Sequence, residues 1–159
     1  MLKKRLVLVS IFLLLFSLFG CSFLNKEKEF SSNGFTITLN ESFVESELVN
    51  VKLFVQNTKM AMAMTTDSNS PSYYTTTSYL KQLMSITNTT GTIIEGSEGD
   101  LKYSYVEYTK EVDGDKYSYI TFVFKSSSKY YGVDFWCREK NIESIRDQIF
   151  EYVKTVKVE

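Results

Sequence analysis

The sequence predicts a single domain of the α+β class, in which two helices pack on an antiparallel sheet. Residues 101–137 hold three aromatic-rich segments in succession, and the short turns between them are typical of hairpins. Two further stretches, one after Pro71 and one after Asn141, repeat apolar residues at the spacing of a helix. We find no internal repeat in the sequence, so one domain accounts for the chain.

Residues 1–20 predict a lipoprotein signal peptide. Basic residues at positions 3–5 precede an apolar run, residues 6–19, that is too short to cross the ~30 Å hydrocarbon core of a bilayer comfortably. The run ends in Leu18-Phe19-Gly20-Cys21, which resembles the lipobox of bacterial lipoproteins. The resemblance implies cleavage after Gly20 and a lipid on Cys21, and therefore a lipid-anchored domain on the extracytoplasmic face of the cell membrane. The alternative is a secretory signal peptide that ends beside an unmodified cysteine.

The folded domain is expected to occupy residues 33–159, after the lipidated cysteine and a polar tether at residues 21–32. A turn at Asn33-Gly34 precedes the first predicted strand, in which phenylalanine, isoleucine and leucine alternate with threonine over residues 35–39. A second strand is predicted at Leu48–Val55.

A third predicted strand, residues 60–64, has methionine on one face and alanine on the other. Methionine at every second position has two interpretations, which are soft-metal capture by the thioethers and flexible filling of a gap in the core. We favour core packing, because thioether side chains adapt to irregular spaces beneath a helix.

Two helices are predicted in the remaining sequence. The first begins near Thr76 or Thr77, stops at residues 88–91 and turns inward Leu80, Leu83 and Met84. The second follows a cap at Asn141 and has one apolar stripe, formed by Ile142, Ile145, Ile149 and Val153. Short strands are predicted at residues 92–95 and 156–158.

The turns within residues 101–137 determine how the three aromatic-rich strands pair. Asp113-Gly114 is typical of a two-residue type I′ turn, which places Tyr105 opposite Phe122. A second turn at residues 126–129 places Phe122 opposite Val133, and both registers sort the side chains in the same way. One face, here called the Phe-rich face, collects Leu101, Tyr103, Tyr105, Ile120, Phe122, Phe124, Tyr131, Val133, Phe135 and Cys137.

The opposite face, here called the mixed face, is the candidate binding surface. The pairing places Tyr108, Tyr119 and Trp136 side by side across three strands, with Thr121 and Asp134 one position away. Large rings with hydrogen-bonding tips dominate the hot spots of binding surfaces. The alternative is that a helix covers this face. We expect the Ile-rich C-terminal helix to cover the Phe-rich face, which leaves the first, less apolar helix to shield the mixed face.

Composition argues against several classes of function. Without residues 1–20 the chain carries 15 basic and 19 acidic residues, a net charge of −4, which disfavours nucleic acid as a partner. The sequence has no histidine, the most common general base and metal ligand, and no glycine-rich phosphate loop or serine-centred elbow. Cys137 therefore has no histidine to activate it and is expected in the core. We predict no catalysis, no cofactor and no metal site.

The order of the predicted elements resembles the PsbP/Mog1-like superfamily, which is common in short bacterial lipoproteins. The resemblance covers residues 30–158 and rests on the opening strand Gly34-Phe35-Thr36-Ile37-Thr38-Leu39, with Asn40 where the family usually has proline. It implies an α/β/α sandwich around an antiparallel sheet, and a scaffold that binds other proteins. We therefore predict a non-catalytic binding or accessory module with an envelope protein or complex as partner. The alternatives are an envelope structural or maintenance protein without a discrete ligand, and a lipoprotein that captures a small molecule.

Overall fold

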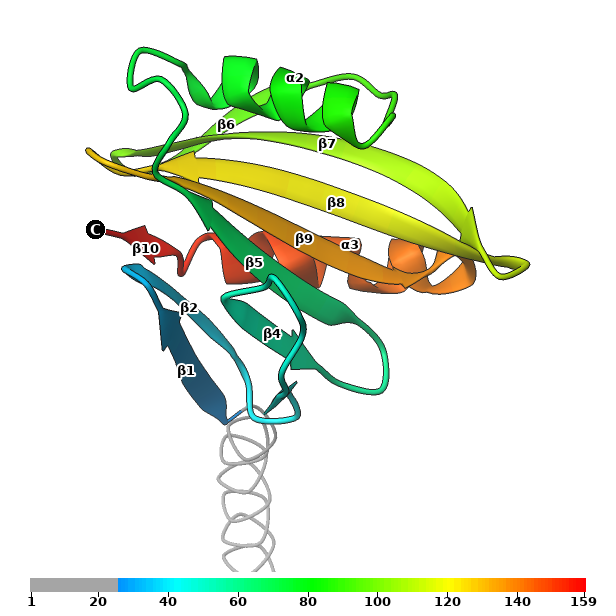
Figure 1. The fold of residues 1–159 in the computed structure, drawn as a ribbon. Coiled ribbons are helices and arrows are strands. Elements are labelled where there is room, and N and C mark those ends of the chain that lie inside the picture. Colours follow the sequence, from blue (N-terminus) through cyan, green and yellow to red (C-terminus); the bar gives the residue numbers. More distant parts are fainter. Residues whose placement is uncertain (1–25) are drawn as a thin grey trace, which may run out of the picture.

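The computed structural model describes residues 26–159, which form two antiparallel sheets and two helices and confirm the predicted α+β class (Figure 1). The predicted signal peptide, its cleavage site after Gly20 and the lipidated Cys21 lie outside the described residues. Within the described part of the chain, no helix combines the length and the apolar character that a membrane span requires.

The larger sheet has seven strands in the order β3-β4-β5-β9-β8-β7-β6, and each neighbouring pair is antiparallel. Its strands are β3 Val44–Glu45, β4 Leu53–Gln56, β5 Ala61–Asp67, β6 Ile94–Glu98, β7 Leu101–Val112, β8 Asp115–Lys125 and β9 Tyr130–Arg138. The smaller sheet has the order β1-β2-β10, and its strands are β1 Glu27–Ser32, β2 Phe35–Asn40 and β10 Lys157–Val158.

The larger sheet is the middle layer of the molecule (Figure 1). Helix α2, Thr76–Ile86, packs on its mixed face, where it contacts β7 and β8. Helix α3, Ile142–Val153, follows a short 3-10 turn, Glu139–Asn141, and packs on the Phe-rich face together with the smaller sheet. The two helices therefore cover the faces that the sequence predicted for them, and the smaller sheet shares the outer layer with α3.

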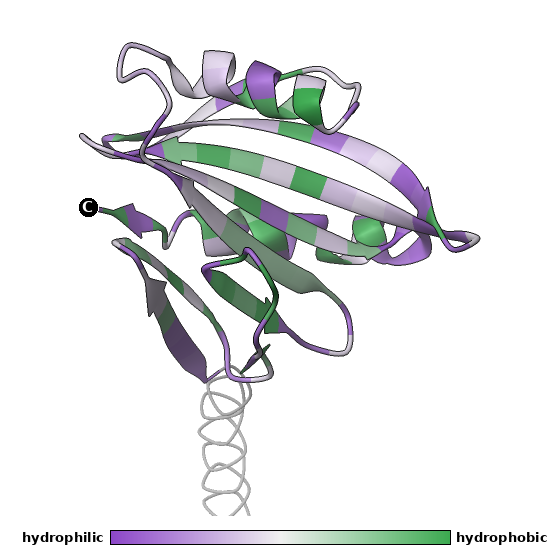
Figure 2. Ribbon diagram, viewed as in Figure 1, coloured by the Kyte–Doolittle hydropathy of each residue, from purple (hydrophilic) through white to green (hydrophobic). Residues whose placement is uncertain are grey.

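Both predicted registers of the central strands are confirmed. Asp113 and Gly114 have φ values of 52° and 84°, as a type I′ turn requires. Phe122 of β8 pairs with Tyr105 of β7 on one side and with Val133 of β9 on the other. Hydrophobic residues are interspersed with more polar ones along β8 and β9 (Figure 2), and successive side chains point to opposite faces, so each strand contributes buried residues to both faces of the sheet.

The Phe-rich face forms the main core. Phe122 is fully buried, and its ring centroid lies 5.6 Å from that of Phe150 on α3. At the edge of this layer Arg146 of α3 donates to Glu107 of β7, with Nη2 2.5 Å from Oε1 and Nε 3.1 Å from Oε2. Cys137 is 3% exposed, which confirms its predicted place in the core, and burial raises the pKa of its thiol.

The methionines of β5 and of the turn before it are packing residues. Met60, Met62 and Met64 are buried in the main core. Ala61 and Ala63 alternate with them along the strand, so the predicted separation of methionine and alanine is correct. The thioethers are enclosed by apolar side chains, which favours the packing interpretation over metal capture.

The tether predicted for residues 21–32 is wrong over its second half. Residues 27–32 form β1, which pairs with β2 through a second type I′ turn, at Asn33 and Gly34. Phe30 is the one fully buried residue of β1 and belongs to the main core, whereas the charged residues before it face solvent. Charged side chains are typical of an edge strand, where they oppose association with other chains, and here they gave the strand the composition of a linker.

Three element boundaries also differ from the prediction. The strand predicted at Leu48–Val55 begins at Leu53, because Asn50 has a positive φ of 65° that interrupts the extended chain. Helix α2 is capped by Thr75, whose hydroxyl accepts a hydrogen bond from the Ser78 N–H in a capping box. The short strand predicted at residues 92–95 is displaced to Ile94–Glu98, where it pairs with the start of β7.

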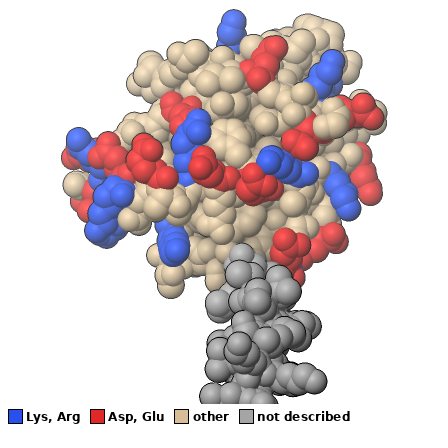
Figure 3. All heavy atoms as spheres, turned by 180° about the vertical axis from the view of Figure 1, so that it is seen from behind, with Lys and Arg blue, Asp and Glu red and all other residues tan. Residues whose placement is uncertain are grey.

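The side of the molecule opposite to the view of Figure 1 carries a band of intermixed acidic and basic side chains (Figure 3). No single sign of charge dominates that view, and such mixing is typical of a solvated surface. The residues that the sequence predicted as a binding surface lie instead on the mixed face of the larger sheet.

Candidate functional site

Four aromatic rings form a continuous row across the mixed face, here called the aromatic row. It consists of Phe54, Trp136, Tyr119 and Tyr108, all of which are half-buried. The ring centroids are 5.9 Å apart for Phe54 and Trp136, 6.2 Å for Trp136 and Tyr119, and 5.2 Å for Tyr119 and Tyr108. Neighbouring rings are inclined by only 12°, 21° and 2°, so the row is close to parallel throughout. Tyr108 ends the row, and the ammonium of Lys110 lies 5.3 Å from the centroid of its ring.

Strand pairing explains why the rings meet. Tyr108 pairs with Tyr119, and Tyr119 with Trp136, as the sequence predicted. The contact between Trp136 and Phe54 crosses β5, whose residues between the two rings are Ala61 and Ala63. An alanine has no side chain beyond Cβ, so the rings on either side approach one another above β5. Sequence reasoning missed Phe54, because its contact depends on the pairing of distant strands.

Helix α2 is held firmly to the mixed face at its N-terminal end. The Tyr130 hydroxyl lies 2.8 Å from the carbonyl oxygens of both Pro71 and Tyr74, which share its single proton, and the Tyr130 ring stacks on Tyr79 with centroids 4.5 Å apart. The Ser104 hydroxyl lies 2.8 Å from that of Thr76. These contacts bury the part of the mixed face that lies under the first turns of α2.

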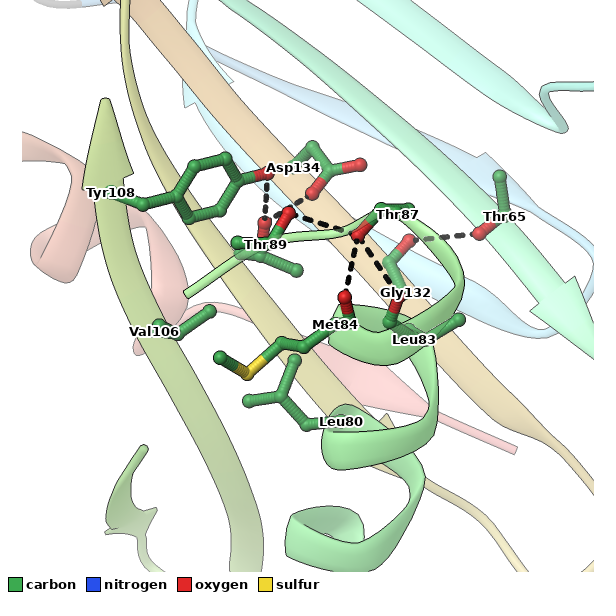
Figure 4. A pocket seen from close by; sticks show the side chains of 11 residues that line it. Thr65, Leu80, Leu83, Met84, Thr87, Thr89, Val106, Tyr108, Gly132 and Asp134 are labelled. Carbon is green, nitrogen blue, oxygen red and sulfur yellow. Dashed lines mark hydrogen bonds between the residues drawn. The ribbon is translucent and has the colours of Figure 1, made fainter. Parts of the chain in front are cut away.

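A pocket of about 200 Å³ lies between the C-terminal half of α2 and the sheet (Figure 4), here called the α2 pocket. Its lining consists of Thr65, Leu80, Leu83, Met84, Thr87, Thr89, Val106, Tyr108, Thr121, Gly132 and Asp134. Gly132 helps to create the space, since a Cβ there would lie 3.1 Å from Thr65 Oγ1 and 3.7 Å from Leu83 Cδ1. Helix α2 therefore leaves part of the mixed face uncovered, and the uncovered part is concave.

Three of the predicted site residues form a hydrogen-bonded chain at the pocket. Thr121 Oγ1 donates to Asp134 Oδ1 at 2.5 Å, and the Tyr108 hydroxyl lies 3.1 Å from Thr121 Oγ1. Because a hydroxyl has one proton and Thr121 gives it to Asp134, Tyr108 is the donor of the second bond. The chain orients one carboxylate oxygen of Asp134 and holds the two hydroxyls in fixed directions.

Burial controls the protonation of the side chains around Asp134. It raises the pKa of the Asp134 carboxyl, against the opposing effects of the Thr121 hydrogen bond and the nearby Lys110 ammonium. Burial also raises the pKa of the Tyr108 and Tyr119 phenols, and the charge of Asp134 adds to both shifts. The two phenols therefore remain protonated near neutral pH, and that of Tyr108 donates to Thr121.

The structure brings all five predicted surface residues together on the mixed face. Tyr108 belongs both to the aromatic row and to the pocket, Tyr119 and Trp136 belong to the row, and Thr121 and Asp134 belong to the pocket. Sequence reasoning missed the lining residues that α2 and the following loop supply, since they depend on where the helix ends above the sheet. Within residues 26–159, no group of three or more His, Cys, Asp and Glu is arranged to hold a metal ion.

No protein-family model matches the sequence, and no curated protein is significantly similar to it. Solved structures share its fold at low identity. A protein of Bacteroides thetaiotaomicron is 14% identical over 83% of this chain, with a TM-score of 0.63, and this chain spans only 48% of that protein. Cyanobacterial PsbP from Synechocystis is 12% identical over 88% of this chain and 96% of that one, with a TM-score of 0.64.

A third similar structure is LpqN of Mycobacterium tuberculosis, described as involved in cell envelope biogenesis. It is 7% identical over 85% of this chain and 91% of that one, with a TM-score of 0.59. Because all three identities are low, the comparisons establish the fold alone, which is PsbP-like.

Proposed function

We propose that this chain is a non-catalytic binding module, anchored by a lipid on Cys21 to the extracytoplasmic face of the cell membrane, that docks an envelope protein on its aromatic row. The aromatic row, whose four rings are half-buried and not enclosed, carries the proposal. Tyr and Trp provide rigid contact area together with a polar tip, the combination that dominates hot spots of protein interfaces. A fold whose central sheet was covered on both faces would instead favour a structural protein without a discrete ligand.

Two observations support the cellular location. The sequence Leu18-Phe19-Gly20-Cys21 has the form of a lipobox and follows a basic and then an apolar segment. The PsbP-like fold is shared with LpqN, a protein described as involved in cell envelope biogenesis. A binding module at the membrane surface would meet envelope proteins as its first partners.

The absence of histidine from the sequence supports a non-catalytic role. Asp134 is the only carboxylate in the α2 pocket, and the other polar groups around it are hydroxyls. A pocket of this kind can orient a ligand through hydrogen bonds, but it offers no paired acid and base.

Photo-crosslinking in cells of the source organism tests the docking site. We expect a benzophenone amino acid at Tyr119 to give one defined protein adduct, and the same group at Tyr73, which is 80% exposed and remote from the row, to give none. Combining Trp136→Ala with the benzophenone at position 119 should abolish the adduct. An adduct that survives Trp136→Ala, or that forms equally from Tyr73, would refute docking on the row.

The anchor has a separate test. Cys21→Ala should block lipidation and leave unprocessed or released protein, whereas Cys137→Ala should retain the lipid because its thiol is buried. Membrane fractionation and intact mass distinguish the two variants. A Cys21→Ala protein that keeps its mass and its partition into detergent would show that Cys21 carries no lipid.

A further inference from the structure

We propose that the α2 pocket binds an ammonium group on a short alkyl chain, with the ammonium at Asp134 and the chain against α2. The inference deepens the proposed function, since it names a ligand class for the same face. It depends on the pocket alone and can be tested without a partner protein.

The pocket is amphipathic. Tyr108, Asp134, Thr87 and Thr89 lie on one side of it, whereas Leu80, Leu83, Met84 and Val106 lie on the other (Figure 4). Leu80 and Val106 are fully buried on the apolar side, and Thr121 is buried beside the half-buried Asp134 on the polar side. A cavity of ~150 Å³ accepts a molecule of about six carbon atoms, so the volume of the α2 pocket suits a short chain with one polar group.

The charge of the pocket selects a cation. Asp134 is the only charged residue in the lining, and its carboxylate accepts one hydrogen bond, from Thr121, although a carboxylate can accept about four. None of the three ion pairs in the described part of the chain involves Asp134. Lys110 acts on Asp134 only from beyond ion-pair distance. A partly buried carboxylate that no cation contacts is unfavourable, and an ammonium ligand would remove that cost.

Lys110 shows that an ammonium group is attracted to the mouth of the pocket. Its Nζ lies 3.5 Å from the carbonyl oxygen of Thr87, a lining residue, and 5.3 Å from the Tyr108 ring centroid. Carbonyl oxygens and the faces of aromatic rings both stabilise cations. An alkylammonium ligand would therefore enter a region of favourable potential and would compete there with Lys110.

Methyl NMR of the full chain in detergent provides a direct test, because the methionines divide between the two faces. Met84 lines the α2 pocket, whereas Met60, Met62 and Met64 belong to the main core and serve as internal controls. With ¹³C-labelled methionine methyl groups, we expect n-butylammonium chloride to shift the Met84 signal in a saturable manner and to leave the three core signals in place. Sodium chloride at equal ionic strength should shift none of them.

Two variants test the charge argument. Asp134→Asn retains an acceptor for Thr121 but removes the charge, so the affinity for n-butylammonium should fall about tenfold or more, whereas that for neutral n-butanol should hardly change. Lys110→Gln should tighten n-butylammonium binding by removing the competing cation. An unmoved Met84 signal, an Asp134→Asn variant that binds n-butylammonium as well as the wild type, or weaker binding by Lys110→Gln would each overturn the proposal.

The source of the ammonium is distinguished by a second ligand. Nα-acetyl-lysine methylamide carries its one charge on the lysine side chain, so a saturable Met84 shift with this compound supports insertion of a lysine from a partner protein. A shift with n-butylammonium alone supports a free amine as the ligand. A positive titration combined with a failed crosslink at Tyr119 would refute docking on the aromatic row and leave the α2 pocket as a small-molecule site.

Discussion

The two faces of the larger sheet contain similar aromatic residues but are covered in different ways. On the Phe-rich face, α3 and the smaller sheet together enclose a cluster of 22 buried residues among those described. On the mixed face, α2 alone covers a cluster of five, and the aromatic row extends beyond it. The difference in cover follows from the polar groups of the side chains. Phe has none and can be buried completely, whereas buried Tyr, Thr and Asp need hydrogen-bond partners. One face is therefore built for stability, and the other retains accessible surface.

Truncation of one ring on each face tests this comparison with the largest expected effect. Phe122→Ala creates a cavity in the main core and should lower the free energy of unfolding by about 3–5 kcal/mol. Tyr119→Ala removes a half-buried ring and should lower the free energy of unfolding by about 1 kcal/mol. Chemical denaturation with unchanged m-values measures both losses. Equal losses would show that the mixed face contributes to the core as much as the Phe-rich face does.

Replacement of Asp134, the one carboxylate of the α2 pocket, should stabilise the fold, by less than the loss at Phe122. Burial raises the pKa of Asp134 in the folded protein, so stability is lost as the pH rises from the ordinary value of 3.8 through the folded-state value. Asp134→Asn removes this loss and should melt at a higher temperature than the wild type at pH 7, with a difference that narrows towards pH 4. Asp100→Asn, at an exposed turn, is the control. A difference in melting temperature between wild type and Asp134→Asn that does not change with pH would contradict the destabilisation by the buried Asp134 charge.

Quenching of Trp136 fluorescence measures how open the mixed face is, and it has the smallest expected effect. Trp136 is the only tryptophan of the chain and is half-buried in the aromatic row, so acrylamide should quench it to an intermediate degree. Phe54→Ala removes the ring stacked on Trp136 and should increase the quenching constant, whereas Tyr73→Ala should leave it unchanged. Strong protection of Trp136 in the free protein would mean that the mixed face is closed, and docking on the row would then be excluded.

Local sequence patterns predicted the central strands, because each register depends on a turn and on alternation within a few residues. The turn at Asp113-Gly114 and the pairing of Tyr108 with Tyr119 are of this kind. Phe54 could not be placed in the row, since β4 reaches β9 only through β5, and the pairing of β5 with β9 joins segments distant in sequence. The alanines of β5 were the available signal, because small residues on one face leave space for neighbouring rings.

The position of β1 and the existence of the α2 pocket were missed for different reasons. Strand β1 buries only Phe30, so its composition matches that of a linker, although the Asn33-Gly34 turn is a strong hairpin signal. The pocket depends on the distance between the end of α2 and the sheet, and on the missing side chain at Gly132. Residue types and spacing do not report that distance.

The early start of β1 limits how far a lipid-anchored domain could move. Glu27 lies six residues after Cys21, and a fully extended chain of that length spans at most about 22 Å. This connecting segment is shorter than the domain is wide. The end of the molecule where β1 begins would therefore stay beside the bilayer. Helix α2 lies at the opposite end in Figure 1. The body of the domain, rather than a linker, would then set the height above the membrane at which a partner meets the mixed face.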